Sequence, residues 1–180
     1  MKTQVFFLCS FLFVLLGCNN DDDDNTPEID KLPPATQIGA NTAGCLVDGI
    51  ALIPKGSSNI FQCFYQLVDG EYYFSISFND KSNGTVGCQV VSRMMEINEG
   101  NSYELAMTFE ENLGYGGFYY EIINYTNIFS TNQINNGNLT INYLDLENLI
   151  VSGTFWFDAI NSSGEIKEIR EGRFDATFTQ

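Results

Sequence analysis

Hydrophobic and polar residues alternate over residues 71–78, which read EYYFSISF. One face of an extended chain would carry the side chains of Tyr72, Phe74, Ile76 and Phe78. A period of two residues is typical of a β-strand with one buried face. Asp69-Gly70 connects this run to another at 60–68, and this dipeptide between alternating runs favours a type I′ hairpin turn. The sequence therefore predicts an antiparallel pair of strands here.

Similar short runs, separated by turn-forming dipeptides such as Asn83-Gly84, Asn136-Gly137 and Ser163-Gly164, occur along most of the chain. The other predicted strands are 45–53, 86–92, 102–109, 118–125, 138–144, 150–160, 165–170 and 173–179. The last three are expected to form a meander, because short turns make consecutive strands pair. We predict an all-β fold, an antiparallel β-sandwich, with a curved, barrel-like antiparallel sheet as the alternative.

The N-terminal segment has a different pattern. Residues 5–16 (VFFLCSFLFVLL) are almost wholly apolar and follow a single positive charge at Lys2. Twelve helical residues would rise about 18 Å, which is less than the roughly 30 Å of a bilayer core. A charged start and a short apolar stretch indicate a secretory signal. We predict a signal peptide at 1–17, a linker at 18–36 and a single β domain at 37–180.

The signal ends in Leu15-Leu16-Gly17-Cys18, which resembles the lipobox of bacterial lipoproteins. The resemblance implies cleavage before Cys18, a diacylglyceryl thioether on its sulfur, and acylation of the new amino group. Each buried CH₂ contributes about 0.8 kcal/mol, so two or three palmitate-like chains would hold the protein stably at a membrane. We expect Cys18 to be the site of lipid attachment.

An acidic stretch, NNDDDDN at 19–25, follows the cysteine. Its like charges repel and it has nothing to bury, so it should stay extended and solvated. It also resembles the acidic export signal of Bacteroidota surface lipoproteins. That resemblance implies a position on the outer membrane, facing the cell exterior. The alternative is a solvated spacer that carries no localisation signal.

Two further stretches carry a wider resemblance. Residues 32–49 (LPPATQIGANTAGCLVDG), together with 54–56 (PKG), and residues 153–175 (GTFWFDAINSSGEIKEIREGRFD) resemble the two ends of an uncharacterised family of Bacteroidota surface lipoproteins. The resemblance implies a β-rich exported domain that closes with a Gly-Arg-Phe-Asp hairpin. It implies no activity.

Charge restricts the possible partners. The chain has 23 acidic and 8 basic residues, a formal net charge of −15. Because phosphate contacts need clustered Lys and Arg, we expect no nucleic-acid partner. The acidity is consistent with solubility in an exposed location.

Three cysteines would remain in the mature domain: Cys45, Cys63 and Cys88. An oxidising compartment would allow one bridge and leave one thiol over. Cys45 and Cys88 each lie in a Gly-Cys-x-Val sequence, which favours a disulfide between them. Three small buried hydrophobic residues are the alternative.

Residue types exclude several kinds of catalysis. The chain has no histidine, so Ser-His-Asp triads, Cys-His dyads and histidine zinc sites are excluded. The glycine-rich stretch 114–117 lacks the Lys-Ser/Thr of a phosphate loop, and 80–84 lacks the glutamate of a calcium loop. We predict no catalytic residue, no metal site and no cofactor. A pair of carboxylates, as in glycoside hydrolases, is the alternative.

Aromatic residues make up 14% of the chain. In the strand predicted at 150–160, the only tryptophan, Trp156, shares a face with polar residues and should meet water. Tyr119 and Glu121 make a similar set with Tyr125, and Tyr115 lies in the adjacent glycine-rich loop. Flat rings beside hydrogen-bonding groups suit sugars and other small molecules. Trp156, Tyr119, Tyr115 and Glu121 are therefore candidate ligand contacts, with burial of the rings as the alternative.

Together these features predict a membrane-anchored, surface-exposed lipoprotein whose domain binds or scaffolds a glycan or a partner protein. A carboxylate-based hydrolase is one alternative. A structural surface protein without a ligand is the other.

Overall fold

A computed structural model describes residues 25–123 and 126–180 of the chain. The predicted signal peptide, Cys18, the aspartates at 21–24 and Tyr125 lie outside these residues. The regular structure of the described part consists of β-strands and one short 3-10 helix. Within that part, no helix is long and apolar enough to span a membrane.

The 3-10 helix η1 spans Glu28–Lys31, ahead of the first strand. The strands are β1 (Thr42–Val47), β2 (Ile50–Leu52), β3 (Phe61–Val68), β4 (Glu71–Asp80), β5 (Thr85–Arg93), β6 (Ser102–Leu105), β7 (Gly114–Ile122), β8 (Thr126–Ser130), β9 (Gly137–Asp145), β10 (Ile150–Ile160) and β11 (Ile166–Thr177).

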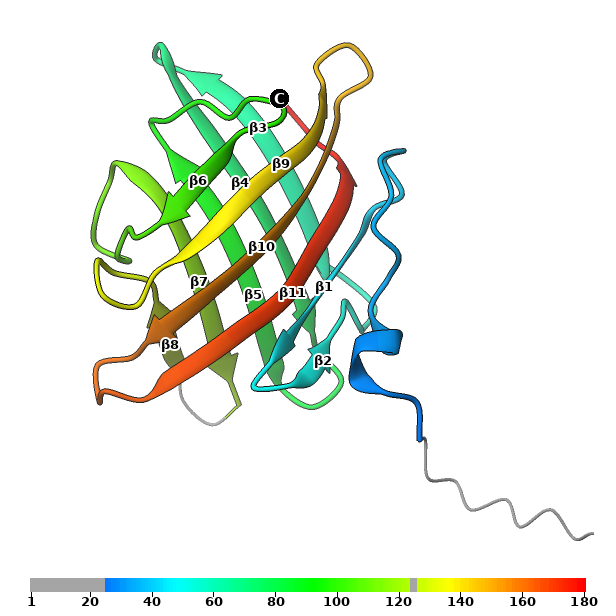
Figure 1. Cartoon of the computed structure of the whole chain (residues 1–180), viewed down its shortest axis with the longest axis vertical. Coiled ribbons are helices and arrows are strands. Elements are labelled where there is room, and N and C mark those ends of the chain that lie inside the picture. The colour runs from blue at the N-terminus through cyan, green and yellow to red at the C-terminus, as the bar shows by residue number, and fades with distance from the viewer. Residues whose placement is uncertain (1–24, 124–125) are drawn as a thin grey trace, which may run out of the picture.

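These strands belong to one antiparallel sheet in the order β2-β1-β11-β10-β8-β7-β5-β4-β3. The long strand β10 also pairs with β9, and β9 pairs with the short strand β6. The sheet is not closed into a barrel. It curves so that β9, β10 and β11 lie over β3, β4 and β5 and run across them (Figure 1).

The core lies between these two halves of the sheet. The rings of Phe74 on β4 and Phe174 on β11 lie 6.0 Å apart, and those of Phe78 and Phe155 lie 6.4 Å apart. Because β4 is not a neighbour of β10 or β11 in the sheet, these contacts cross the interior. The all-β, antiparallel prediction is confirmed. The two halves enclose one core as in the predicted sandwich, and continuous pairing joins them as in the curved-sheet alternative.

The turn at Asp69-Gly70 has the conformation that its sequence predicted. Asp69 and Gly70 have φ angles of 52° and 89°, the two positive values that a type I′ turn requires. They join β3 and β4, which pair in register from Phe61 and Phe78 to Val68 and Glu71. The first predicted hairpin is therefore confirmed.

Three strand predictions differ from the structure. The predicted strand 45–53 is two strands, β1 and β2, separated by a turn at Asp48-Gly49. The predicted strands 165–170 and 173–179 are one strand, β11, so the meander of three final strands is wrong. Glu171, which lies between these two predicted strands, has φ 55° and is at a bulge inside β11. Strand β8 was not predicted.

The linker is also shorter than the predicted 18–36. The side chain of Glu28 accepts a hydrogen bond from the backbone N–H of Ala51 at 2.8 Å, and Leu32 is buried. The hydroxyl of Thr36 donates to Asp175 on β11 at 2.6 Å. The chain is therefore packed against the domain from Glu28 onward.

Candidate functional site

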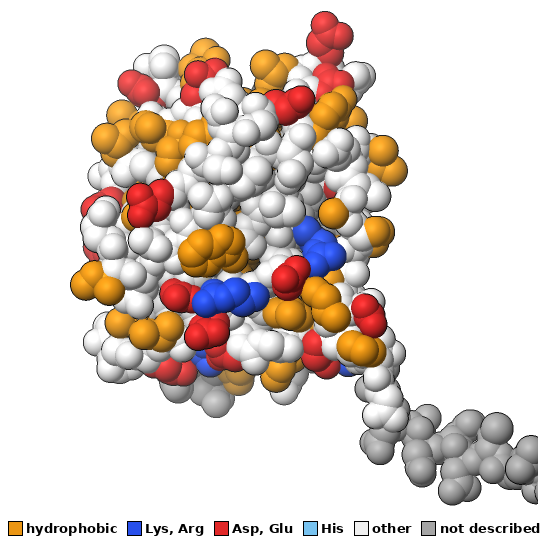
Figure 2. All heavy atoms as spheres, in the orientation of Figure 1, with side chains coloured by type: hydrophobic (Ala, Val, Ile, Leu, Met, Phe, Trp, Pro, Cys, Tyr) orange, Lys and Arg blue, Asp and Glu red, His pale blue; other side chains and the backbone are white. Residues whose placement is uncertain are grey.

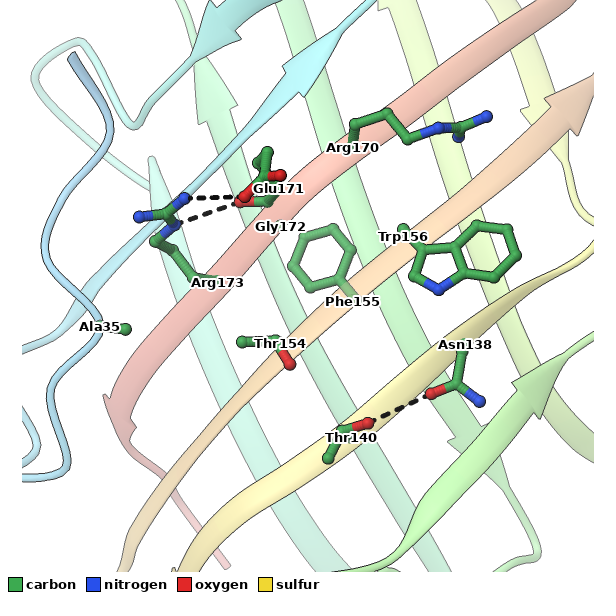
Figure 3. Close-up of a pocket in the computed structure, with 10 residues that line it drawn as sticks. All are labelled: Ala35, Asn138, Thr140, Thr154, Phe155, Trp156, Arg170, Glu171, Gly172 and Arg173. Carbon is green, nitrogen blue, oxygen red and sulfur yellow. Dashed lines mark hydrogen bonds and ion pairs between the residues drawn. The ribbon is translucent and has the colours of Figure 1, made fainter. Parts of the chain in front are cut away.

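A β-bulge on the outer face of the sheet shapes the candidate site. β10 and β11 pair regularly until Phe155 opposite Gly172, and then resume at Phe157 opposite Ile169. Trp156 therefore faces two residues of β11, Arg170 and Glu171. A bulge bends its strand and redirects side chains. Here it directs the Arg170 side chain toward Trp156 (Figure 3).

Trp156 is 46% exposed on this outer face, as its polar neighbours in the sequence predicted. The guanidinium carbon of Arg170 lies 5.7 Å from the centre of its ring. Arg170 is held there by an ion pair with Asp158 at 2.7 Å and by bonds that it donates to the carbonyls of Phe157 and Ile169, at 3.1 and 2.9 Å. The ring and the guanidinium thus form one fixed surface.

This surface borders a shallow hollow of about 420 Å³. Its wall consists of residues from β9, β10 and β11 and one from the segment ahead of β1: Ala35, Asn138, Thr140, Thr154, Phe155, Trp156, Arg170, Glu171, Gly172 and Arg173. The hydroxyl of Thr140 donates to the Asn138 amide oxygen at 3.2 Å, and Arg173 pairs with Glu171 at 3.3 Å. The hollow therefore combines a flat ring with several hydrogen-bonding groups.

The surrounding face is charged with both signs. Basic side chains lie over β10 and β11, with acidic side chains beside them (Figure 2). Arg170 and Arg173 are two of the 8 basic residues in the chain, which carries a net charge of −15. The hollow is therefore one of the less acidic parts of an acidic protein.

The structure does not bring Tyr119 to this surface. Tyr119 is 5% exposed and its ring packs against that of Phe129 in the core, with centres 5.6 Å apart. Its hydroxyl donates to Glu121 at 2.9 Å. Burial raises the pKa of the Tyr119 phenol, and the Glu121 carboxylate raises it further. The expectation that Tyr119 faces water is wrong, because its side of β7 faces the core.

Tyr115 is not in a loop, as we expected, but in β7, on the same side as Tyr119 and at the opposite end of the strand. It is half-buried and stacks on Tyr103, with ring centres 4.4 Å apart. Its hydroxyl donates to the backbone carbonyl of Glu96 at 2.7 Å. Of the four candidate ligand contacts, only Trp156 borders the hollow, and the four do not form one site.

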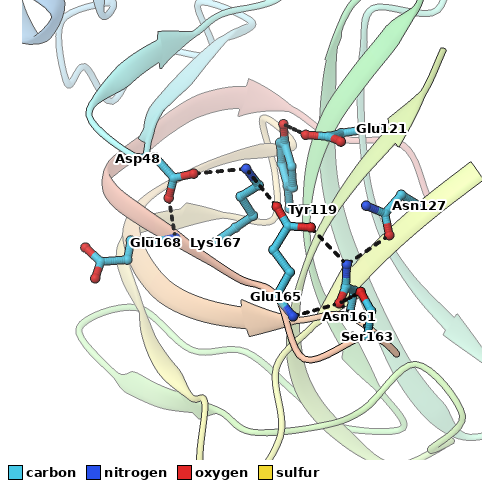
Figure 4. A network of polar contacts seen from close by, with 9 residues as sticks. All are labelled: Asp48, Tyr119, Glu121, Asn127, Asn161, Ser163, Glu165, Lys167 and Glu168. Carbon is cyan, nitrogen blue, oxygen red and sulfur yellow. Dashed lines mark hydrogen bonds and ion pairs between the residues drawn. The ribbon is translucent and has the colours of Figure 1, made fainter.

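A second polar cluster ties the β1–β2 turn to β11 (Figure 4). The Lys167 ammonium group lies 3.1 Å from Asp48 and 3.5 Å from Glu165. Asp48 also accepts the backbone N–H of Glu168 at 3.0 Å. Burial acts to lower the pKa of Lys167, but the hydrogen bond and charge of Asp48 outweigh it and raise the pKa. These paired charges stabilise the fold at the turn.

Four carboxyl groups in the described part of the chain have a clearly perturbed pKa, and in each it is lowered: Asp48, Asp80, Asp145 and Asp175. A lowered pKa favours the ionised form and does not suit a proton donor. The described residues also include no group of three or more acidic or cysteine side chains that could hold a metal ion.

The three domain cysteines, Cys45, Cys63 and Cys88, are buried free thiols. The bridge predicted between Cys45 and Cys88 is not formed in this structure.

Several residues of the hollow were missed at the level of sequence, above all Arg170, Glu171 and Asn138. They come from two strands, β9 and β11, which pair with β10 on either side, and only the strand register brings them beside Trp156. The stretch Arg-Glu-Gly-Arg at 170–173 could have indicated a bulge as well as a turn, because glycine is common at both.

We compared the chain with family models, curated proteins and solved structures, and found no match in any of the three. The assignment of a function therefore depends on the chain's own residues.

Proposed function

We propose that this protein is a lipid-anchored lipoprotein of the outer cell surface whose β domain binds a saccharide in the hollow beside Trp156. The anchor part of the proposal is supported by the apolar segment, Cys18 and the acidic stretch of the sequence. The binding part is supported chiefly by one observation, the exposed tryptophan held against Arg170 at the edge of a polar hollow.

The chemistry of the hollow matches that of a sugar ring. A pyranose presents a face of C–H groups, which packs on an aromatic ring, and a rim of hydroxyls, which need donors and acceptors. Trp156 offers the ring. Thr140, Asn138 and Arg173 offer hydroxyl, amide and guanidinium groups around it. The arginine–tryptophan contact also orients the indole ring before any ligand arrives, which reduces the entropy lost on binding.

The test uses the fact that the chain has one tryptophan. The purified mature protein in detergent is screened against an immobilised glycan array, and each glycan retained is titrated in solution. Binding over the indole ring should change the emission of Trp156. Trp156→Ala should weaken binding by roughly 5- to 30-fold, corresponding to about 1–2 kcal/mol of lost ring contact.

Phe109→Ala is the matched control, because Phe109 is a large ring that is 50% exposed in a loop away from the hollow. It should leave glycan binding unchanged. The saccharide proposal fails if no glycan is retained, or if Trp156→Ala and Phe109→Ala bind every retained glycan as tightly as the unaltered protein.

A further inference from the structure

A second hollow lies at the end of the curved sheet, where the β3–β4 hairpin and the turn between β9 and β10 meet the segment that follows β5 (Figure 1). We call it the end hollow. Its volume is about 590 Å³, which is within the range of small-molecule sites. No described residue lines both this hollow and the one beside Trp156. The two hollows are therefore separate places at which a ligand could bind.

Tyrosine hydroxyls hold the segment after β5 in place as one wall of the end hollow. The Tyr65 phenol donates to the backbone carbonyl of Ile97 and accepts the Ile97 N–H, both at 3.3 Å. The Tyr115 phenol donates to the backbone carbonyl of Glu96 at 2.7 Å. Because these bonds fix the wall before any ligand arrives, less ordering has to accompany binding.

Much of the surface of the end hollow is apolar. The ring of Tyr72 stacks on that of Tyr65, with centres 5.3 Å apart, and both residues line the hollow. Leu67, Val68 and Leu146 also line it, although their side chains are 60%, 47% and 57% exposed. Large apolar side chains that gather around one hollow and remain in water favour a ligand with an apolar part.

The charge at the end hollow is negative. The described residues that line it include one acidic side chain, Glu96, and no basic one. A second carboxylate, that of Glu99, accepts the backbone N–H of the lining residue Leu144 at 2.9 Å. Burial raises the pKa of Tyr65 to about 12, so this phenol stays neutral. Aromatic rings beside carboxylates favour a cation, because both the charge and the faces of the rings attract it.

We infer that the end hollow binds a small amphipathic cation, an apolar ring or short chain that carries a protonated amine. The apolar part packs on Tyr72 and Leu67, and the amine lies beside Glu96. This site goes beyond the proposed function, since it depends on neither the saccharide site nor the lipid anchor.

Three probes that share a naphthalene ring test the site. They are 1-naphthylmethylamine, 1-naphthylmethanol and 1-naphthoate, which are cationic, neutral and anionic at neutral pH. Their binding to the purified mature protein is measured by equilibrium dialysis with the same detergent concentration on both sides, so that uptake by micelles cancels. We expect the amine to bind most tightly and the carboxylate least tightly. Glu96→Gln should weaken binding of the amine by roughly 2- to 5-fold and leave binding of the alcohol unchanged.

Leu67→Lys should weaken binding of the amine by roughly 10-fold, because it removes an apolar contact and adds a like charge at the mouth of the hollow. Leu113→Lys is the matched control, since Leu113 is 62% exposed and lines neither hollow. It should leave binding of the amine unchanged. Trp156→Ala should also leave it unchanged, which keeps this test separate from that of the saccharide site.

Several results would overturn the assignment of a cation site. One is that no probe binds, or that the alcohol or the carboxylate binds as tightly as the amine. Another is that Leu67→Lys binds the amine as tightly as Leu113→Lys does, or that Trp156→Ala alone weakens binding. A dimer of the unaltered protein in light scattering, which Leu67→Lys alone converts to a monomer, would show that a second copy of the chain covers the hollow instead.

Discussion

Asp175 is the basis of our most quantitative prediction. This aspartate of β11 is almost fully buried, and its carboxylate accepts four hydrogen bonds. The Thr36 hydroxyl donates to it at 2.6 Å, and three successive backbone N–H groups donate at 2.8–3.2 Å, those of Ile38, Gly39 and Ala40. Asp175 thereby fixes the segment ahead of β1 to β11, the last strand in the chain.

Asp175→Ala should be strongly destabilising because it leaves these donors without their acceptor. A hydrogen bond to a charged group contributes about 1.5–3 kcal/mol, and since the four bonds share one carboxylate we count two of them, or about 3–6 kcal/mol. For a domain of this size that loss lowers the melting temperature by on the order of 10–20 °C. Thermal unfolding followed by circular dichroism measures it.

Asp145→Ala is the control. Asp145 also accepts four hydrogen bonds, three at 2.8–2.9 Å from Glu147 and Asn148 and one at 3.2 Å from Tyr143, but it lies at the exposed end of β9, where water can replace the lost acceptor. Its effect should be much smaller. Equal losses for the two variants would refute the argument that burial of the donors, and not the number of bonds, sets the cost.

The same carboxyl group should make stability depend on pH. Burial acts to raise the pKa of Asp175, but the four hydrogen bonds outweigh it, so the pKa lies below its ordinary value of 3.8. Stability from a lowered pKa is fully present above the ordinary value and is lost as the pH falls through the folded-state value. Between pH 7 and pH 3, the unaltered protein should therefore lose more unfolding free energy than Asp175→Asn.

Two further predictions concern packing and the anchor. Gly117→Ala should lower the free energy of unfolding by about 1–3 kcal/mol in a urea titration, because a Cβ there would lie 2.6 Å from the Phe157 ring. The neighbouring Gly116→Ala should cost less in the same titration, because its closest contacts, at 3.0 Å, include the flexible end of Met107. Cys18→Ser should abolish labelling by radioactive palmitate and move the protein out of the membrane fraction; unchanged labelling and fractionation would contradict the predicted lipid attachment.

Strand parity predicted side-chain direction well where one face of a strand is wet. In β10, Trp156 is 46% exposed, as its polar neighbours predicted, and the flanking residues Phe155 and Phe157, which have the opposite parity, are 3% and 0% exposed. It failed in β7, where both faces are covered. Tyr119 points into the core, while Phe118 on the other face packs against Val91 and Met107. Without a polar face, alternation contains no information about which side is inward.

The candidate site was predictable only in part for a related reason. Exposure of Trp156 follows from its own neighbours in the sequence, but its partners come from β9 and β11. A register shift of one residue would turn Arg170 away from the ring, and register depends on the packing of the whole sheet. The bulge at Glu171 is likewise a property of the pairing between two strands.

The packing of residues from Glu28 onward limits the distance between the hollow and a membrane. If Cys18 carries the lipid, about ten residues separate it from η1, and a chain of that length spans at most about 35 Å. Ala35, which follows η1, borders the hollow itself. A glycan bound beside Trp156 would then be held close to the bilayer, within reach of envelope polymers and of neighbouring proteins embedded in the same leaflet.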